Sequence, residues 1–410
     1  MTCEVAVMNK RGIALAADSA VTLSDNKGNA KKIYHTAEKL FSLSPELPVA
    51  IMTYGAADIM GVPWETVVKV YAQKLDGQRF GTLAAYAQNF IDFIKGAYWL
   101  FPMETQARYV RDLVGDVWKR PYKNVLDETL GKGKGKPTRK DMLEKLAALI
   151  EKDHDLWERR YQDLASAAPD YGQRVRETFA EAIDKVESDL FEGFSLTAPI
   201  KEGLRKTVEL AYQKEWFHPM DRGRYVVIAG MGEAEPFPVL LEYEVGTLAA
   251  GELRYRKAGE TRVDNDMDGW IKPFAQSEII DSVIQGIHPN VYDRFIEEVA
   301  RMTLDDEEDE EDSERIEERK QAFADLFREK VLLDFANPLF LAVSALPRQD
   351  LAKMAESLVN LTAFLKRMTV DDEETVSEPI DVALLSKGDG FIWVKHKDVH
   401  TLAHDRSIST

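Results

Sequence analysis

Residues 2–22 read TCEVAVMNKRGIALAADSAVT, and this stretch decides the fold. Cys3–Met8 and Ile13–Ala17 are short runs of apolar character, joined by the turn-forming residues 9–12, Asn-Lys-Arg-Gly. Two such runs on either side of a turn predict an antiparallel hairpin. Residues 39–43 and Val49–Thr53 flank a proline-containing connection and predict a second hairpin. The chain is therefore expected to begin with antiparallel strands.

The rest of the chain alternates between helical and strand-like patterns. Apolar residues recur with helical spacing from Ala56 to about Met220, interrupted by a loop of glycines and lysines at 130–137. The later segments are strand-like at 225–229 and 239–244, helical at 274–287, 315–330 and 354–368, and a closing hairpin at 380–386 and 391–395. This order predicts a layered α+β core that carries a helical insertion.

Composition narrows the function classes. The chain has 410 residues and a formal net charge of −18, which argues against a nucleic acid or an anionic membrane as partner. Its single cysteine excludes an intrachain disulfide and a cysteine-rich zinc site. There is no apolar run of about 20 residues and no signal peptide, so a cytoplasmic protein without cofactor is expected.

Several stretches resemble known binding motifs but lack a feature that the motif requires. Residues 226–232, VVIAGMG, follow a strand as a dinucleotide loop does, but Glu235 occupies the third glycine position. The acidic run Asp305–Asp312 lacks the alternating ligands and central glycine of a calcium loop. His396, His400 and His404 lie near a tail and do not form a tight cluster with carboxylates, so no metal site is expected.

Thr2 offers a nucleophile once Met1 is removed. Methionine before a small residue is commonly trimmed, which would leave a hydroxyl and a free α-amine on one residue. An α-amine has an ordinary pKa of about 7.7–8, so it can act as a general base near neutral pH. This is the chemistry of an N-terminal nucleophile. No propeptide is expected before Thr2, and methionine aminopeptidase alone is expected to activate the chain.

The neighbours of Thr2 resemble the start of proteasome β-type subunits and of the related bacterial ring protease. In that family a threonine opens the first strand, an aspartate follows the second and a lysine begins the third. The matching residues here are Thr2, Asp18 and Lys39. Further matches are the stretches 18–22 (DSAVT), 49–58, 225–230 with 239–244, 274–286 and 379–393. The resemblance covers about half of the chain.

This resemblance implies a role for each matching residue. Thr2 Oγ would attack an amide carbonyl and form an acyl-enzyme, with the Thr2 amine as base. Lys39 would lower the pKa of the Thr2 hydroxyl and amine, and Asp18 would hold Lys39 charged and oriented. The backbone N–H of Gly55 would bind the oxyanion, where one donor is typically worth about 3 kcal/mol.

Substrate binding and the lysine assignment also follow from the family pattern. Val21 and Thr22 would hold the substrate backbone by strand pairing. Lys32 is a second candidate for the catalytic lysine, and Lys39 is favoured by its spacing to the turn at 44–48. The separation between Asp18 and Lys39 is longer than usual in the family and implies an enlarged loop.

Other positions stay open. If no residue is deleted, the oxyanion donor falls at Tyr54 instead of Gly55. The family's supporting serine falls at Ala275 or Ser277, and its closing Asp and Ser fall somewhere within 371–377.

The implied fold is the four-layer αββα sandwich of N-terminal nucleophile hydrolases with a large helical insertion. Its expected parts are core segments at 1–95, 222–290 and 350–397, a helical insertion at 96–221, an acidic and helical insertion at 291–349, and a tail at 398–410. The implied function is a threonine-type hydrolase of amide bonds, and the favoured form is a proteasome-like peptidase that acts on peptides or unfolded proteins. An ATPase unfoldase partner is a further implication.

Two alternatives stay open beside this function: a catalytically silent scaffold subunit of the same fold, and a small-molecule amidase. A homo-oligomer is also expected, because the apolar face of the predicted helix at 83–94 would need a partner.

Overall fold

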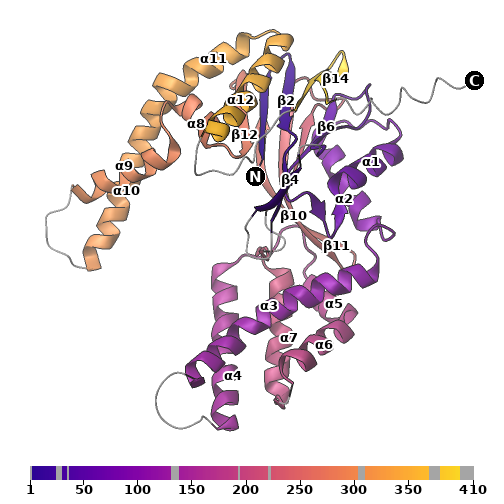
Figure 1. The fold of residues 1–410 in the computed structure, drawn as a ribbon, viewed down its shortest axis with the longest axis vertical. Helices are drawn as coiled ribbons and strands as arrows, with labels where there is room; N and C mark the ends of the chain where they lie inside the picture. The colour runs from indigo at the N-terminus through magenta and orange to yellow at the C-terminus, as the bar shows by residue number, and fades with distance from the viewer. Residues whose placement is uncertain are drawn as a thin grey trace, which may run out of the picture.

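The protein is a mixed α+β chain with antiparallel sheets. The computed structural model describes residues 2–24, 30–34, 37–130, 138–192, 194–219, 223–302, 310–368 and 379–397. Two five-stranded sheets lie at its centre, and helices flank them and extend away in two arms (Figure 1).

The first sheet contains the strand that starts at Cys3. Its order is β12-β1-β2-β13-β14, with every neighbouring pair antiparallel. Both hairpins expected for it are present, β1–β2 and β13–β14. The strands are β1 (Cys3–Asn9), β2 (Gly12–Asp18), β12 (Gly269–Ala275), β13 (Ile380–Ser386) and β14 (Gly390–Lys395).

The second sheet has the order β11-β10-β9-β6-β5 and is also antiparallel throughout. The pairing of β5 with β6 is the second predicted hairpin. Two small two-stranded sheets join β3 to β4 and β7 to β8. These strands are β3 (Val21–Ser24), β4 (Ala30–Tyr34), β5 (Leu40–Ser42), β6 (Val49–Gly55), β7 (Asp58–Ile59), β8 (Val62–Pro63), β9 (Arg224–Gly230), β10 (Val239–Ala249) and β11 (Glu252–Arg262).

Strand alternation divides the buried residues among three apolar layers, because successive side chains of a strand point to opposite faces. In β1, Ala6 and Met8 face the second sheet, whereas Val5 and Val7 face helices on the outer side. The outer helices of the first sheet are α8 (Glu278–Gln285), α11 (Asn337–Ala345) and α12 (Arg348–Met368). Helices α1 (Trp64–Leu75) and α2 (Leu83–Gly96) cover the second sheet.

The apolar face of α2 is filled within the chain. Leu83, Tyr86 and Phe90 are buried against α1 and strands of the second sheet. Thr82 caps the helix by accepting a hydrogen bond from the N–H of Ala85. The apolar face at 83–94 is therefore covered within the chain and gives no support to an oligomer, which stays a prediction.

A helical arm lies beyond the end of the second sheet (Figure 1). It consists of α3 (Met103–Leu130), α4 (Arg139–Arg160), α5 (Tyr171–Thr178), α6 (Ala180–Leu190) and α7 (Ala198–Gln213). Its apolar interior includes Trp118 and Tyr212 and reaches Ala249 of β10. The fully buried Arg254 of β11 donates hydrogen bonds to the carbonyl oxygens of Ala211, Lys214 and Trp216, which ties the arm to the sheet.

A second arm extends to the left from the first sheet in Figure 1, whereas the α3–α7 arm lies below the sheets. It contains α9 (Pro289–Met302), α10 (Glu310–Val331) and the short π-helix η1 (Leu332–Ala336), which leads into α11. Asn9 anchors the end of α11 because its side-chain amide donates to the carbonyl oxygens of Val343 and Leu346. The structure thus packs α11 on the core, whereas the sequence pattern grouped it with an insertion.

In the two five-stranded sheets, two strands were not anticipated. Residues 252–262 form β11, and the segment 274–287, predicted as one helix, begins as the end of β12 and becomes helical only at Glu278. Met1, the tail from 398 and the candidate Asp and Ser at 371–377 lie outside the described residues, as do His400 and His404. Among the helices of the described ranges, none is both long and apolar enough to cross a membrane.

Candidate functional site

Four polar side chains meet at the start of β1, between the two sheets. Thr2, Glu4, Asp18 and Lys39 are all buried; Thr2 is 4% exposed, Lys39 5% and Glu4 0%. Thr2 precedes β1, Asp18 ends β2 and Lys39 precedes β5. Three successive predicted strands thus bring the three predicted residues to one place, and Glu4 joins them.

Asp18 is held by backbone and side-chain donors. Its Oδ1 accepts from the N–H of Cys3 at 3.0 Å and lies 2.6 Å from Lys39 Nζ. Its Oδ2 accepts from the N–H of Ala20 at 3.0 Å. A carboxylate with these partners is satisfied and fixed in orientation, so it can position the lysine.

Lys39 is positioned from both ends. Its carbonyl oxygen accepts a hydrogen bond of 2.8 Å from the N–H of Thr53, which fixes its backbone against β6. Its Nζ lies between two carboxylates, 2.6 Å from Asp18 and 3.4 Å from Glu4 Oε1. A buried ammonium needs such partners because an uncompensated charge in the interior is costly.

Glu4 was missed by the sequence analysis and is the most perturbed acid of the cluster. Its Oε2 accepts a hydrogen bond of 3.2 Å from Thr2 Oγ1. Burial raises the pKa of Glu4 to about 8, against the lowering effect of Lys39. A signal was present in the sequence: Glu4 stands two residues after Thr2 in an apolar strand, so both side chains lie on one face.

Cys3 lies outside the cluster of Thr2, Glu4, Asp18 and Lys39. Cys3 points to the opposite face of β1, among the outer helices, and burial raises the pKa of its thiol well above the ordinary value. It is therefore an inert packing residue. In the described part of the chain, no group of three or more His, Cys, Asp or Glu side chains is arranged to hold a metal ion.

Gly55 is required by the backbone. It ends β6 with φ +82°, and a Cβ there would come within 1.7 Å of the carbonyl oxygen of Gly223. The preceding Tyr54 stacks on Tyr225 and donates a hydrogen bond from its hydroxyl to Glu242. Oxyanion binding by the N–H of Gly55, or of Tyr54, stays a prediction.

The predicted substrate strand and the alternative lysine share a small sheet. Val21 and Thr22 lie in β3, opposite Tyr34 and Ile33 of β4. Lys32 also lies in β4, opposite Leu23. The structure therefore brings Lys39 to Asp18 and assigns Lys32 to a separate hairpin.

Ser277 follows a residue that contacts Thr2, but it lines a separate cavity. The N–H of its neighbour Gln276 donates to the Thr2 carbonyl oxygen at 3.1 Å. Ser277 itself precedes α8 as its N-cap residue and hydrogen bonds Asp281. It lines a cavity of about 510 Å³ together with Asp281 and residues of α9 and η1. The other candidate, Ala275, is the last residue of β12 and supplies no hydroxyl.

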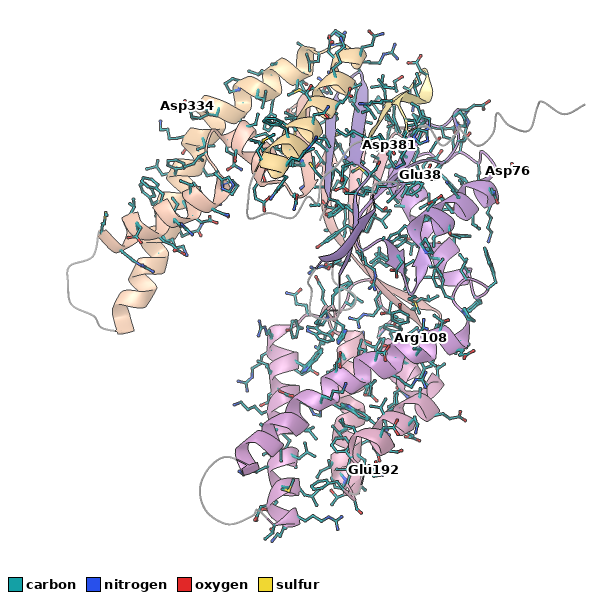
Figure 2. The ribbon with its side chains drawn as sticks, in the orientation of Figure 1. Glu38, Asp76, Arg108, Glu192, Asp334 and Asp381 are labelled. Atoms are coloured by element: carbon teal, nitrogen blue, oxygen red, sulfur yellow. The ribbon has the colours of Figure 1, made fainter. Side chains whose placement is uncertain are left out.

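A second buried polar cluster lies behind Asp18 and also was not anticipated. Lys397 Nζ lies 3.0 Å from Asp381 Oδ2 and donates to Ser19 Oγ at 3.0 Å. His396 lies between Asp381 and Glu38, with Nδ1 3.1 Å from the former and Nε2 3.8 Å from the latter; both acids are labelled in Figure 2. These contacts attach the end of the described chain to the residue after Asp18.

Comparison with known proteins gives a distant likeness in fold. No family model matches the chain, and no curated protein matches its sequence. Two similar solved structures are the Anbu (Gly-1) mutant from Hyphomicrobium sp. strain MC1 and Anbu (ancestral beta-subunit) from Yersinia bercovieri. The first is 9% identical, with 97% of this chain and 89% of that chain covered and a TM-score of 0.32. The second is 9% identical, with coverage of 98% and 91% and a TM-score of 0.31.

Proposed function

We propose that this chain is a threonine-type N-terminal nucleophile hydrolase of amide bonds, with peptides or unfolded proteins as substrates. The proposed fold family is the αββα sandwich of proteasome β-type subunits. The observation that carries the proposal is the buried contact network in which Thr2 Oγ1, Glu4, Lys39 and Asp18 follow one another at 3.2, 3.4 and 2.6 Å. Perturbed acids and bases next to a hydroxyl are typical of reactive sites.

The proposed reaction begins when cleavage before Thr2 frees its α-amine. Thr2 Oγ1 then attacks the carbonyl carbon of an amide while its proton passes to a neighbouring base, and the positive charge of Lys39 stabilises the negative charge that develops. Breakage of the C–N bond leaves an ester on Thr2, and the leaving nitrogen takes the proton from the base and departs as the amine product. Water then hydrolyses this ester. Asp18 does not react; it keeps Lys39 in place.

The test uses the full chain and a threonine-reactive β-lactone. Intact-mass measurement would show whether Met1 is absent and whether one probe molecule attaches to the chain, and peptide mapping would locate it. Thr2→Ala keeps the amine and should abolish labelling, while Thr2→Ser keeps a hydroxyl and should retain part of it. Equal labelling of wild type and Thr2→Ala would reject the nucleophile assignment. Fluorogenic peptides and small acyl amides, assayed in parallel, separate a peptidase from a small-molecule amidase.

A silent scaffold subunit is the second candidate, and one observation favours it. Thr2 is only 4% exposed, which leaves little room for a substrate carbonyl to reach its hydroxyl, as an active enzyme would require. Under this alternative the folded chain, freed of Met1, would neither react with the β-lactone nor hydrolyse any amide. An ATPase unfoldase partner belongs to the peptidase proposal and would be sought only after hydrolysis has been observed.

A further inference from the structure

The four-residue cluster has an excess of acid. Among its described side chains, Lys39 is the single cation, and it faces the two carboxyl groups of Asp18 and Glu4. The two acids differ in how they are satisfied. Asp18 has donors on both oxygens, whereas Glu4 Oε1 accepts no hydrogen bond from any described residue and has only the longer ion-pair contact with Lys39. Glu4 is thus the acid that is left with proton-binding capacity.

Glu4 also has the contact that a base needs. Its Oε2 lies 3.2 Å from Thr2 Oγ1, with the hydroxyl donating toward the carboxylate, and this is within reach of direct proton transfer. The partners of Asp18 are different: its oxygens accept hydrogen bonds from the N–H groups of Cys3 and Ala20 and from Lys39. Thr2 directly precedes β1, and Glu4 is the second residue of that strand, so the two side chains lie on the same side of the chain.

We propose that the Glu4 carboxylate, and not the α-amine of Thr2, accepts the hydroxyl proton when Thr2 attacks the amide. This inference rests on the proposed function. In the step, the Oγ1–H bond breaks, its proton moves to Glu4 Oε2, a bond forms from Oγ1 to the carbonyl carbon, and the π electrons move to the carbonyl oxygen. Collapse of the intermediate breaks the C–N bond, and Glu4 returns the proton to the leaving nitrogen.

The electrostatics suit this exchange. A general base is most effective when its pKa lies near the working pH, and burial places the pKa of Glu4 at about 8. Lys39 opposes protonation of Glu4 and Asp18 favours it, so both forms are accessible near neutral pH. The titratable and charged groups that act on or respond to Glu4 come from β1, β2, β6 and the segment before β5: Thr2, Cys3, Asp18, Lys39 and Tyr54.

The experiment measures the rate at which the β-lactone labels Thr2 as a function of pH, by intact mass. Glu4→Gln keeps the shape of the side chain and removes the base. Glu235→Gln is the matched control, because Glu235 is also buried but binds the N–H groups of Leu83 and Gly232. We expect Glu4→Gln to label at least roughly 10²-fold more slowly and to lose the rise in rate toward pH 8, whereas Glu235→Gln labels like wild type.

Three results would overturn the proposal, and they are distinguishable. If wild type labels and Glu4→Gln labels as fast, Glu4 is not the base and the proposed function stands. If Glu4→Gln is slow but keeps the same pH dependence, Glu4 only positions its neighbours. If wild type does not label at Thr2, the proposed function and this inference fall together.

A second variant covers the case in which Glu4→Gln does not fold. Glu4→Asp keeps the carboxylate but withdraws it from Thr2 Oγ1 by one methylene group. A reduced rate with a retained rise toward alkaline pH supports the proposal, and a rate equal to that of wild type rejects it.

Discussion

Lys39 Nζ lies 2.6 Å from Asp18 Oδ1, across a gap of 21 residues in the sequence. That gap contains β3 and β4, which form a small sheet of their own. The enlarged loop expected from the long spacing is therefore partly a paired hairpin. The two residues meet because Asp18 ends β2 and the backbone of Lys39 is bonded to β6.

Removing Lys39 should be costly for both stability and reactivity. Lys39→Ala leaves Asp18 and Glu4 buried without their cation, so we expect a loss of roughly 3–5 kcal/mol in the free energy of unfolding. Labelling of Thr2 by the β-lactone should also be lost. Lys32→Ala is the control and should change neither quantity by much. Loss of labelling with Lys32→Ala but not with Lys39→Ala would transfer the lysine role to Lys32.

Glu4 should make the folded state less stable as pH rises. Its pKa is about 8 in the folded chain and about 4.5 when unfolded, so the folded state holds a proton that the unfolded state has already released. The stability of wild type should therefore decline between these two pH values, and Glu4→Gln should remove this part of the decline. We expect Glu4→Gln to be more stable than wild type above neutral pH and less different near pH 4, in urea unfolding at several pH values. A constant difference between the two proteins would contradict the assignment.

Gly55 should tolerate no side chain. Its φ of +82° is in the left-handed region, and a Cβ would meet Gly223 O at 1.7 Å. Gly77 is a matched control with φ +72° and no described atom within 4 Å of an added Cβ. We expect Gly77→Ala to cost about 1–2 kcal/mol from backbone strain alone, and Gly55→Ala to cost clearly more, above about 3 kcal/mol. Similar losses for the two variants in denaturant unfolding would show that the close approach to Gly223 is not rigid.

A homo-oligomer remains a prediction, and the end of α12 gives it a new basis. Phe364 is 53% exposed and Met368 63%, and both lie on one stripe of the helix with Leu361 and Leu365. Exposed apolar side chains that are grouped in this way are typical of protein contacts. We expect light scattering at micromolar concentration to show more than one copy, and Phe364→Asp to reduce the mass. A monomeric wild type would remove the prediction.

The sequence predicted the central strands of both five-stranded sheets and missed two of the four edge strands, β11 and β12. Short apolar runs identified β1, β2, β6, β9 and β13, because their side chains pack on a second sheet or on helices. The strands β11 and β12 are at sheet edges, where charged residues such as Arg256 and Lys272 replace apolar ones. Edge strands need only one buried face, so their hydrophobic pattern is weak.

The candidate site was predicted in part. Thr2, Asp18 and Lys39 were found because each stands at a strand end, where the family pattern places them. Glu4 was missed because a single acid within an apolar strand reads as a solvent-facing residue, and only the second sheet makes that face interior. Asp381 and Lys397 were missed for a different reason. Their ion pair joins a strand to the residues after its hairpin, and no spacing pattern in the sequence predicts such a contact.

Arg254 has a consequence for how substrates could be selected. Its guanidinium is fully buried and bonded to three carbonyl oxygens at the end of the α3–α7 arm, while its backbone belongs to β11. Swinging the arm away would expose those carbonyl groups and strand a charge in the interior. These hydrogen bonds therefore favour one position of the arm relative to the second sheet. If the arm limits access to Thr2, it would exclude large molecules at all times, because access would not depend on an opening motion.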